Sequence, residues 1–428
     1  MIAHNLYQIG SRLRNPSLAR WYQFLKKSEN WSREQLLDYQ LQQLQKLLDW
    51  TAESSPFYQK HFKKAGFDPK TLRSLNDLQH CPIITKQDLL THNKAIHSTR
   101  DCGKCFTAET SGSTGQALVF QRDESWDSFH RASVRRGLSW YGVNPWDRNG
   151  YFWGYNINPS DQLKTQCLDS LQNRFRTFTY DQDSLRKFLH RLKHAKYVGG
   201  YSSMIYEVAR LAVEEELLDA PLKLKLVKGT SEKIFPHYHS VSEQAFGRKI
   251  SSEYGSAESG IIAFECLAGN MHIQSEGVIV EEYEGEILVT NLLARSFPTI
   301  RYQLGDFIEL APSNEICPCG MAHPLLRSIT GRVGKTVYGK TKTYPSLTFY
   351  YVAKNIFFQH GIGINYQFVQ SEKGRLTMRL EGLVDNKLRT LIDAEMCKYF
   401  GTDIEYEIDD EQCIHNGDGK ARDFVSTL

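Results

Sequence analysis

The chain has 428 residues, of which 41% are hydrophobic and 24% charged, and its net charge is +3. This length favours more than one domain, and the composition is that of a globular protein. The small net charge gives no reason to expect nucleic acid or an anionic membrane surface as a partner. The first residues lack the apolar core of a signal peptide, and no stretch could form a membrane span, so we expect a cytoplasmic protein.

The first part of the chain alternates between helix and strand patterns. Ser32 and Gln35 have the spacing of a capping box, and leucines recur at helical spacing after them. Amphipathic helices are predicted over 183–195 and 201–218, and an apolar strand over 224–229. This alternation predicts a large α/β body.

Strand patterns dominate after residue 272. Two strands are predicted to meet at the dipeptide Glu284-Gly285. The last hundred or so residues place alternating apolar positions on both sides of one helix pattern, which is typical of a small α+β domain. We therefore predict an α/β protein with a large N-terminal domain over residues 1–331 and a small C-terminal domain over residues 332–428.

One short segment contains only hydroxyl residues and glycines: Thr110, Ser111, Gly112, Ser113, Thr114 and Gly115. Glycine lets backbone N–H groups approach a ligand closely, and small hydroxyl side chains add donors, a combination that suits phosphate. The segment has neither the Gly-Lys-[Ser/Thr] ending of a Walker loop nor the G-x-G-x-x-G pattern of a dinucleotide site. By itself it fits either a phosphate-binding loop or a flexible surface turn.

Nine cysteines in a chain of this length do not make a disulfide framework, so we expect thiols or metal ligands. Three thiolates and one imidazole, an ordinary tetrahedral zinc set, are offered by Cys266, His272, Cys317 and Cys319. Cys102 and Cys105 form a Cys-x-x-Cys pattern that could replace Cys266 or His272 in this set. Buried free cysteines and a hydrogen-bonded histidine are the structural alternative.

Together with the loop at 110–115, later segments resemble, in order, the motifs of the adenylate-forming ligases, the superfamily of the acyl-CoA synthetases. They are "YGSAESG" at 254–260, "GEILVTNL" at 285–292, "RYQLGD" at 301–306, "ITGR" at 329–332 and "GDGKAR" at 417–422. An ordered series over nearly the whole chain is far more specific than one motif. Within the superfamily, "SSPFYQKHF" and "CPIITKQDL" resemble the phenylacetate–CoA ligases and their relatives in capsule-polysaccharide clusters.

The resemblance implies an ATP-dependent, AMP-forming carboxylate ligase with a mobile small domain. A carboxylate would attack the α-phosphorus of ATP, and CoA or an amine would then displace AMP from the acyl-adenylate. The implied cofactors are ATP, Mg²⁺ and a structural Zn²⁺, and a sugar-linked acid such as a uronate is one candidate substrate. Adenylyl transfer to a hydroxyl group and nucleotide binding without catalysis are the alternatives.

The resemblance also implies roles for single residues. Lys420 would bridge the substrate carboxylate and the α-phosphate, and Glu258 would bind Mg²⁺. Asp306 would accept hydrogen bonds from the ribose hydroxyls, and Arg332 would contact ribose or phosphate. Beyond the loop at 110–115, the other implied nucleotide-binding residues are Thr230, Ser231, Glu232, Tyr254, Gly255 and Ser256. Ordinary structural roles, such as a solvated charge, a core tyrosine or a turn aspartate, are the alternative for each.

The sequence departs from the superfamily pattern at two places. The lysine that often follows the glycine-rich loop is absent from "GQALVF", so Lys335, Lys340 or Mg²⁺ alone would have to supply its charge. Gly334 stands where the hinge residue is usually Asp or Lys. Four aromatic residues would either stack on the acid or belong to the core: Tyr151, Phe152, Trp153 and Tyr155.

Overall fold

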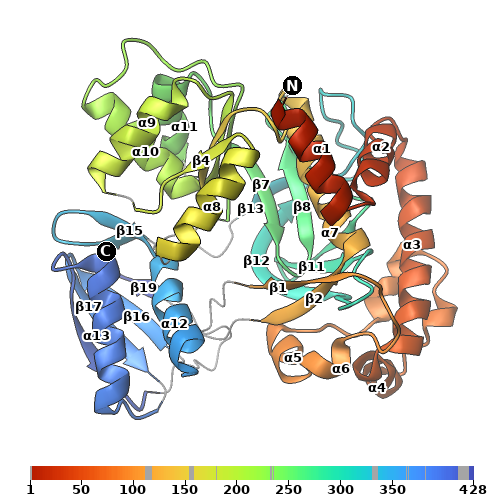
Figure 1. Cartoon of the computed structure of the whole chain (residues 1–428). Coiled ribbons are helices and arrows are strands. Elements are labelled where there is room, and N and C mark those ends of the chain that lie inside the picture. Colours follow the sequence, from red (N-terminus) through yellow and green to blue (C-terminus); the bar gives the residue numbers. More distant parts are fainter. Residues whose placement is uncertain are drawn as a thin grey trace. The chain divides into compact units, whose positions relative to one another are not determined.

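The chain folds into two compact units, whose elements are drawn in Figure 1. The first comprises Met1–Ala108 and Phe120–Arg332, and the second comprises Glu109–Val119 and Val333–Leu428. The second unit is therefore assembled from two separate stretches of sequence. The computed structural model describes residues 2–110, 118–153, 159–179, 181–231, 234, 236–329, 336–362, 364, 366–380, 382–412 and 424–428.

A sheet of eleven strands forms the centre of the first unit. Its strands are β3 (Asn149–Phe152), β4 (Arg174–Arg176), β5 (Tyr197–Tyr201), β6 (Leu226–Thr230), β7 (Ser251–Ser256), β8 (Gly260–Glu265), β9 (Met271–Ile273), β10 (Val278–Tyr283), β11 (Glu286–Asn291), β12 (Tyr302–Leu310) and β13 (Leu325–Ile329). They lie in the order β10-β11-β12-β13-β9-β8-β7-β6-β5-β3-β4. The run from β4 to β7 is parallel, and the remaining neighbours are antiparallel.

The helices of the first unit lie against this sheet or against one another. They are α1 (Ile2–Arg14), α2 (Leu18–Ser28), α3 (Arg33–Ser54), α4 (Pro56–Ala65), α5 (Lys86–Thr91), α6 (Asn93–Ile96), α7 (Glu124–Trp140), α8 (Pro159–Leu171), α9 (Gln182–Leu192), α10 (Ser202–Glu214) and α11 (Pro236–Phe246), with 3-10 turns η1 (Pro69–Thr71) and η2 (Leu75–His80). Helix α9 contacts β3, α10 contacts β5 and β6, and α7 contacts β8. A Cβ at Gly137 of α7 would lie 2.5 Å from the Phe264 ring of β8, so only glycine permits this close approach. Among the described residues, no helix is both long and apolar enough to cross a membrane.

Two local predictions are confirmed in detail. The Ser32 hydroxyl accepts from the Gln35 backbone N–H, and the Gln35 side chain accepts from the Ser32 N–H, so a capping box starts α3. Strands β10 and β11 pair in antiparallel fashion up to Tyr283 and Glu286. The two residues between them, Glu284 and Gly285, have φ angles of 53° and 78°, as a type I′ hairpin turn requires.

The second unit is smaller and mixes strands with two helices. Strands β16 (Tyr366–Glu372), β17 (Arg375–Leu380), β18 (Glu405–Asp409) and β19 (Phe424–Ser426) form a sheet in the order β18-β17-β16-β19, and β14 (Thr336–Tyr338) pairs with β15 (Thr343–Pro345). The helices are α12 (Leu347–His360) and α13 (Asn386–Phe400). The ring of Phe349 in α12 stacks on Phe368 at 3.8 Å and packs near Phe400 and Phe424. The predicted fold class, α/β with a smaller α+β part, is confirmed.

Two further strands, β1 (Cys105–Glu109) and β2 (Val119–Asp123), form a separate two-stranded sheet. The chain between them carries the whole glycine-rich segment, 110–115. This ladder therefore holds both ends of the predicted phosphate loop.

Candidate functional site

Several predicted nucleotide-binding residues lie where parallel strands of the first unit end. Thr230, the last residue of β6, pairs with Tyr201 at the end of β5 and with Glu253 of β7. Carboxyl ends of parallel strands form one edge of the sheet, where ligands bind in open α/β folds. Ser231 follows with a φ of 68°, a strained left-handed conformation for a non-glycine residue. Strained backbone of this kind concentrates at ligand-binding segments.

Tyr254 and Asp306 are brought together from two different strands. Tyr254 lies in β7 and Asp306 lies in β12, and both side chains are half-buried. The Tyr254 hydroxyl donates a hydrogen bond of 2.7 Å to Asp306 Oδ2. This bond fixes both the phenol ring and the carboxylate in orientation, so the pair forms one polar, partly exposed element.

Glu258 lies in the turn between β7 and β8 and is 4% exposed. The Tyr302 hydroxyl donates to its Oε1 across 3.3 Å. The guanidinium of Arg122 donates to the neighbouring carbonyl of Ala257 at 2.7 Å, and its charge interacts with that of Glu258. The buried Glu258 carboxylate is therefore held beside a hydroxyl and near a cation.

The turn that carries Glu258 is tightly constrained. A Cβ at Gly255 would lie 2.3 Å from the carbonyl oxygen of Gly260 across the hairpin, so this position requires glycine. The Ser256 hydroxyl accepts from the Ser259 backbone N–H at 3.0 Å and closes the turn. Gly255 and Ser256, both predicted as nucleotide-binding residues, thus constrain the backbone of the turn that carries Glu258.

Of the glycine-rich segment at 110–115, the structure describes only the first residue, Thr110. Thr110 is 7% exposed, and its N–H donates to the Leu118 carbonyl at 2.9 Å. The Leu118 N–H in turn donates to the Thr110 hydroxyl at 3.1 Å. The other predicted loop residues, together with Glu232, Arg332, Gly334, Lys335 and Lys420, lie outside the described residues. Lys340, one candidate for the compensating charge, lies in the second unit with its Nζ 2.5 Å from Glu405 Oε1.

The predicted aromatic residues divide between core and surface. Phe152 is fully buried, and its ring lies 4.2 Å from that of Phe188. Trp153 is 39% exposed and stands between two nearly parallel rings, with Tyr201 at 4.9 Å and Tyr151 at 6.1 Å. A flat planar ligand could extend this stack. Tyr155 lies outside the described residues.

A second cluster joins the four residues predicted as zinc ligands. One ligand atom from each lies within 4.8 Å of all the others: Cys266, His272, Cys317 and Cys319. The Cys266 and Cys317 sulfur atoms are 3.7 Å apart, and the Cys319 sulfur is 3.2 Å from His272 Nε2. A tetrahedral ion with Zn–S bonds of about 2.3 Å would place two sulfur ligands about 3.8 Å apart. The spacing of these donors fits such an ion.

Two matching turns present the cysteines. The Gly269 N–H donates to the Cys266 carbonyl at 2.9 Å, and the Gly320 N–H donates to the Cys317 carbonyl at 3.0 Å. Both glycines adopt positive φ angles, 81° and 87°. The side-chain amide of Asn270 also donates to the Cys317 sulfur at 3.3 Å. Hydrogen bonds of this kind stabilise a thiolate.

The protonation of the cluster agrees with a metal-binding role. Burial lowers the pKa of His272 to about 4, so the imidazole is neutral at pH 7, as a metal ligand must be. Burial raises the pKa of Cys266. Against burial, hydrogen bonds from the backbone and side chain of Cys319 lower the pKa of Cys317. The donors are therefore a neutral imidazole and thiols of which one, Cys317, has a lowered pKa.

Cys102 and Cys105, the alternative pair, do not join this cluster in the described part of the chain. The Cys102 sulfur instead donates to the Arg100 carbonyl at 3.5 Å, and Cys105 is exposed at the start of β1.

A buried charge network adjoins the cluster, and the sequence did not reveal it. Arg136 of α7 lies 2.6 Å from Glu276, and both side chains are essentially inaccessible. Glu276 Oε1 is also 2.9 Å from Nε2 of His323, whose ring lies 6.5 Å from that of His272. Although burial disfavours the charge, Arg136 and His323 hold the pKa of Glu276 well below its usual range. The network joins α7 to the strand region around the cluster.

No family model matches the chain. It is 24% identical over 305 residues to protein CapK of Staphylococcus aureus, and this alignment covers 64% of this chain and 63% of CapK. It is 22% identical over 321 residues to the phenylacetate-coenzyme A ligase of Thermus thermophilus. This alignment covers 71% of this chain and 72% of the ligase. The match thus spans less than two thirds of CapK.

Solved structures of 2-hydroxyisobutyryl-CoA ligase share the fold. The complex with 2-HIB-AMP and CoA has a TM-score of 0.61 at 20% identity, over 94% of this chain and 91% of that chain. An open conformation with the same two ligands has a TM-score of 0.56 at 19% identity, over 94% and 93%. Relatives and fold support the adenylate-forming ligase superfamily. The two relatives align with 64% and 71% of this chain.

Some residues around the superfamily motifs were missed by sequence reasoning. Lys228 pairs with Glu253 at 2.6 Å, and both lie on strands beside Thr230. A charged residue inside the apolar strand "LKLVKG" was the available signal, because a buried charge requires a partner. Arg122 and Tyr302 carried no such signal, since each reaches Glu258 only through the tertiary fold.

Proposed function

We propose that the protein is an ATP-dependent, AMP-forming carboxylate ligase that activates an acid as its acyl-adenylate and transfers the acyl group to the thiol of CoA. The observation that carries this proposal is the 2.7 Å hydrogen bond between Tyr254 and Asp306 beside the hairpin of Glu258. These residues come from two superfamily-like motifs, at 254–260 and 301–306, that are separate in sequence. The names of the relatives and of the fold neighbours support the same reaction class.

In the first step, a carboxylate oxygen forms a bond to the α-phosphorus of ATP, and the bond from that phosphorus to pyrophosphate breaks. Asp306 would hold the ribose and Tyr254 would flank the adenine, so the pair orients the nucleotide. Thr110 and the rest of its loop would donate hydrogen bonds to the β- and γ-phosphates. Lys420 would offset the charge that develops between the carboxylate and the α-phosphate.

Mg²⁺ fits the carboxylate of Glu258, because this ion is commonly bound by one or two carboxylates together with substrate phosphates. When bound, Mg²⁺ would neutralise charge on the phosphate oxygens. Glu258 would keep its position through Tyr302 and the constrained hairpin turn. Arg122 would limit the negative charge at this site before ATP arrives.

In the second step, the thiol sulfur attacks the acyl carbon, the thiol loses its proton, and AMP leaves with the bonding electrons. Trp153 and its stacked neighbours are the proposed wall of the acid pocket. A Zn²⁺ held by Cys266, His272, Cys317 and Cys319 would have a structural role, because it would join the end of β8, β9 and the chain before β13.

The test is a pyrophosphate-release screen over a panel of acids that includes aryl acids, hydroxy acids and uronates. With the best acid, AMP release is then measured with CoA and, separately, with amines. Release that depends on CoA supports the proposal. AMP release with an amine but not with CoA would show that the product is an amide and not a thioester. AMP recovered on an acceptor would indicate adenylyl transfer. ATP binding without turnover over the whole panel would contradict an enzymatic role.

A further inference from the structure

Helix α1 presents its apolar side chains to solvent instead of to the core. Four of them recur on one helix face and are between 40% and 78% exposed: Ile2, Leu6, Ile9 and Leu13. A different face of the helix meets the protein, where the ring of Tyr7 lies 5.3 Å from that of Trp146. A surface helix of a globular protein ordinarily buries its apolar stripe. The exposed stripe of α1 therefore needs another explanation.

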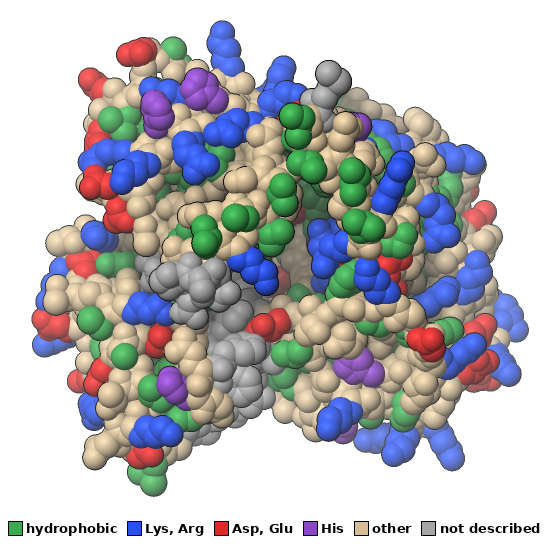
Figure 2. Space-filling model, viewed as in Figure 1, with side chains coloured by type: hydrophobic (Ala, Val, Ile, Leu, Met, Phe, Trp, Pro, Cys, Tyr) green, Lys and Arg blue, Asp and Glu red, His purple; other side chains and the backbone are tan. Residues whose placement is uncertain are grey.

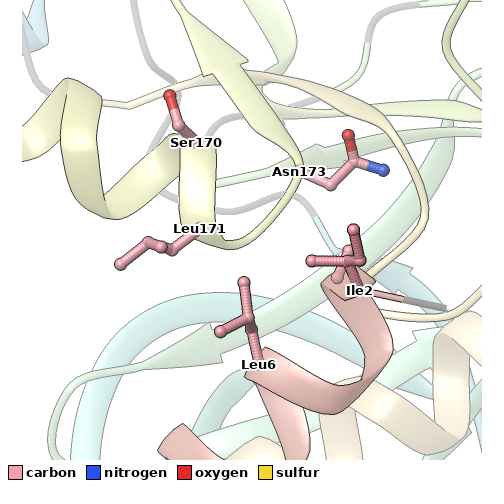
Figure 3. Close-up of a pocket in the computed structure, with 6 residues that line it drawn as sticks. Ile2, Leu6, Ser170, Leu171 and Asn173 are labelled. Carbon is pink, nitrogen blue, oxygen red and sulfur yellow. The ribbon is translucent and has the colours of Figure 1, made fainter.

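Helix α8 extends this apolar surface. It contacts α1, and its residues Leu163, Leu168 and Leu171 are 65%, 51% and 52% exposed. Ile2 and Leu6 project toward Leu171 beside a pocket of about 530 Å³ (Figure 3). Figure 2 shows hydrophobic side chains gathered over both helices.

These seven side chains form what we call the α1–α8 apolar face. In the described part of the chain they account for seven of the sixteen large hydrophobic side chains that are exposed. Single exposed hydrophobic residues are normal, but a contiguous patch marks an interaction surface.

The segment that carries α1 is strongly cationic. Residues 1–28 contain five Lys and Arg residues and neither Asp nor Glu. Arg12 and Arg14 are exposed in the last turn of α1. Lys104 adds a cation at the same end, where its Nζ donates to the carbonyls of Leu13 and Arg14 at 3.1 and 3.0 Å. The small net charge of the whole chain conceals this local excess.

We propose that the α1–α8 apolar face docks the protein on an anionic lipid membrane. The aliphatic side chains would enter the boundary between headgroups and acyl chains, while Arg12 and Lys104 would lie among anionic headgroups. A second copy of the chain is a poorer occupant, because a symmetric contact would bring two cationic segments together. This proposal does not depend on the proposed reaction. It differs from the expectation, based on the small net charge, that the protein has no anionic membrane surface as a partner.

The experiment is co-sedimentation of the full chain with vesicles of phosphatidylcholine, with and without about 30% phosphatidylglycerol. We expect binding to the anionic vesicles that weakens about tenfold or more when the salt is raised to about 0.5 M. The variant Leu6→Ser/Ile9→Ser/Leu13→Ser should also lose at least about tenfold in affinity for the anionic vesicles. The matched control Leu37→Ser/Leu267→Ser/Ile316→Ser, which removes exposed aliphatic side chains elsewhere, should bind as the parent does.

Charge is tested by Arg12→Gln, which should weaken binding to anionic vesicles while the circular dichroism spectrum shows that the chain remains folded. Failure of the parent chain to bind anionic vesicles would overturn the proposal, as would equal losses in the stripe variant and its control. Self-association that the stripe variant removes, without vesicle binding, would assign the face to a second copy. Absence of both vesicle binding and self-association would leave a protein partner as its occupant and would equally overturn the proposal.

Discussion

The hydroxyl of Tyr254 donates to the carboxylate of Asp306 across 2.7 Å, although 52 residues separate the two in sequence. In the proposed reaction, this bond orients the carboxylate that holds the ribose. Its effect should therefore appear in nucleotide affinity more than in the chemical step.

We expect Tyr254→Phe to raise KM for ATP about threefold to tenfold in pyrophosphate exchange, because a hydrogen bond of this kind contributes about 0.5–1.5 kcal/mol. The rate constant at saturating ATP should change less. Tyr283→Phe, at a tyrosine that is 42% exposed on β10, is the matched control. An unchanged KM for ATP in Tyr254→Phe would show that the phenol does not orient Asp306 toward the nucleotide.

Trp153 stands in a stack with Tyr201 and Tyr151 and remains 39% exposed. If this stack is the wall of the acid pocket, Trp153→Ala should raise KM for the acid by about tenfold, because stacking on an aromatic side chain contributes about 1 kcal/mol beyond area burial. KM for ATP serves as the internal control and should stay within twofold, or about 0.4 kcal/mol. Equal changes in both constants would place Trp153 in a general structural role.

The sulfur and imidazole donors of the second cluster lead to a metal prediction. Protein purified without chelator should contain about one zinc ion per chain by elemental analysis. Cys317→Ser should lose most of this metal and melt at lower temperature, whereas Cys167→Ser, at an exposed cysteine, should do neither. Equal zinc contents in the two variants would exclude a site at this cluster.

Glu276 and Arg136 form a fully buried ion pair, which makes stability depend on pH. The folded-state pKa of Glu276 lies well below its unfolded value of about 4.3. Its contribution is therefore fully present above about pH 4.3 and is lost as the pH falls through the folded-state pKa. Glu276→Gln should lower the free energy of unfolding at pH 7 by about 3–5 kcal/mol, because Arg136 is left without its counter-ion.

Denaturant titrations at several pH values check this. The difference between the parent chain and Glu276→Gln should shrink as the pH falls below about 4. Glu309→Gln, at an exposed carboxylate 3.5 Å from Arg327, should change stability by less than about 1 kcal/mol. A constant difference over the whole pH range would contradict ionisation of Glu276 as its cause.

Local features of the fold could be predicted because their causes lie within a few residues. The capping box of Ser32 and Gln35 and the turn at Glu284-Gly285 each depend on side chains or backbone angles of adjacent positions. The same holds for the helices that the structure places at Gln182–Leu192 and Ser202–Glu214, close to the predicted ranges. Their ends differ by a few residues, since terminal turns depend on packing that periodicity does not contain.

Long-range polar partners could not be predicted. Arg136 and Glu276 are 140 residues apart, and nothing in the sequence of α7 distinguishes a buried arginine from a solvated one. The same limit applies to the α1 stripe, because periodicity identifies an apolar helix face but not what covers it. Tyr254, Glu258 and Asp306 could be predicted as site residues for a different reason, namely the resemblance of their motifs to those of the superfamily. The fold then showed their neighbours.

The most direct test of the proposed function is acid-dependent exchange between ATP and labelled pyrophosphate, measured for the parent chain and for Lys420→Ala. Lys398→Ala, on α13 of the same unit, is the control. We predict exchange with at least one carboxylic acid, a loss of about 100-fold or more in Lys420→Ala, and no loss in Lys398→Ala. Full exchange in Lys420→Ala, or no acid-dependent exchange in the parent chain, would contradict the account.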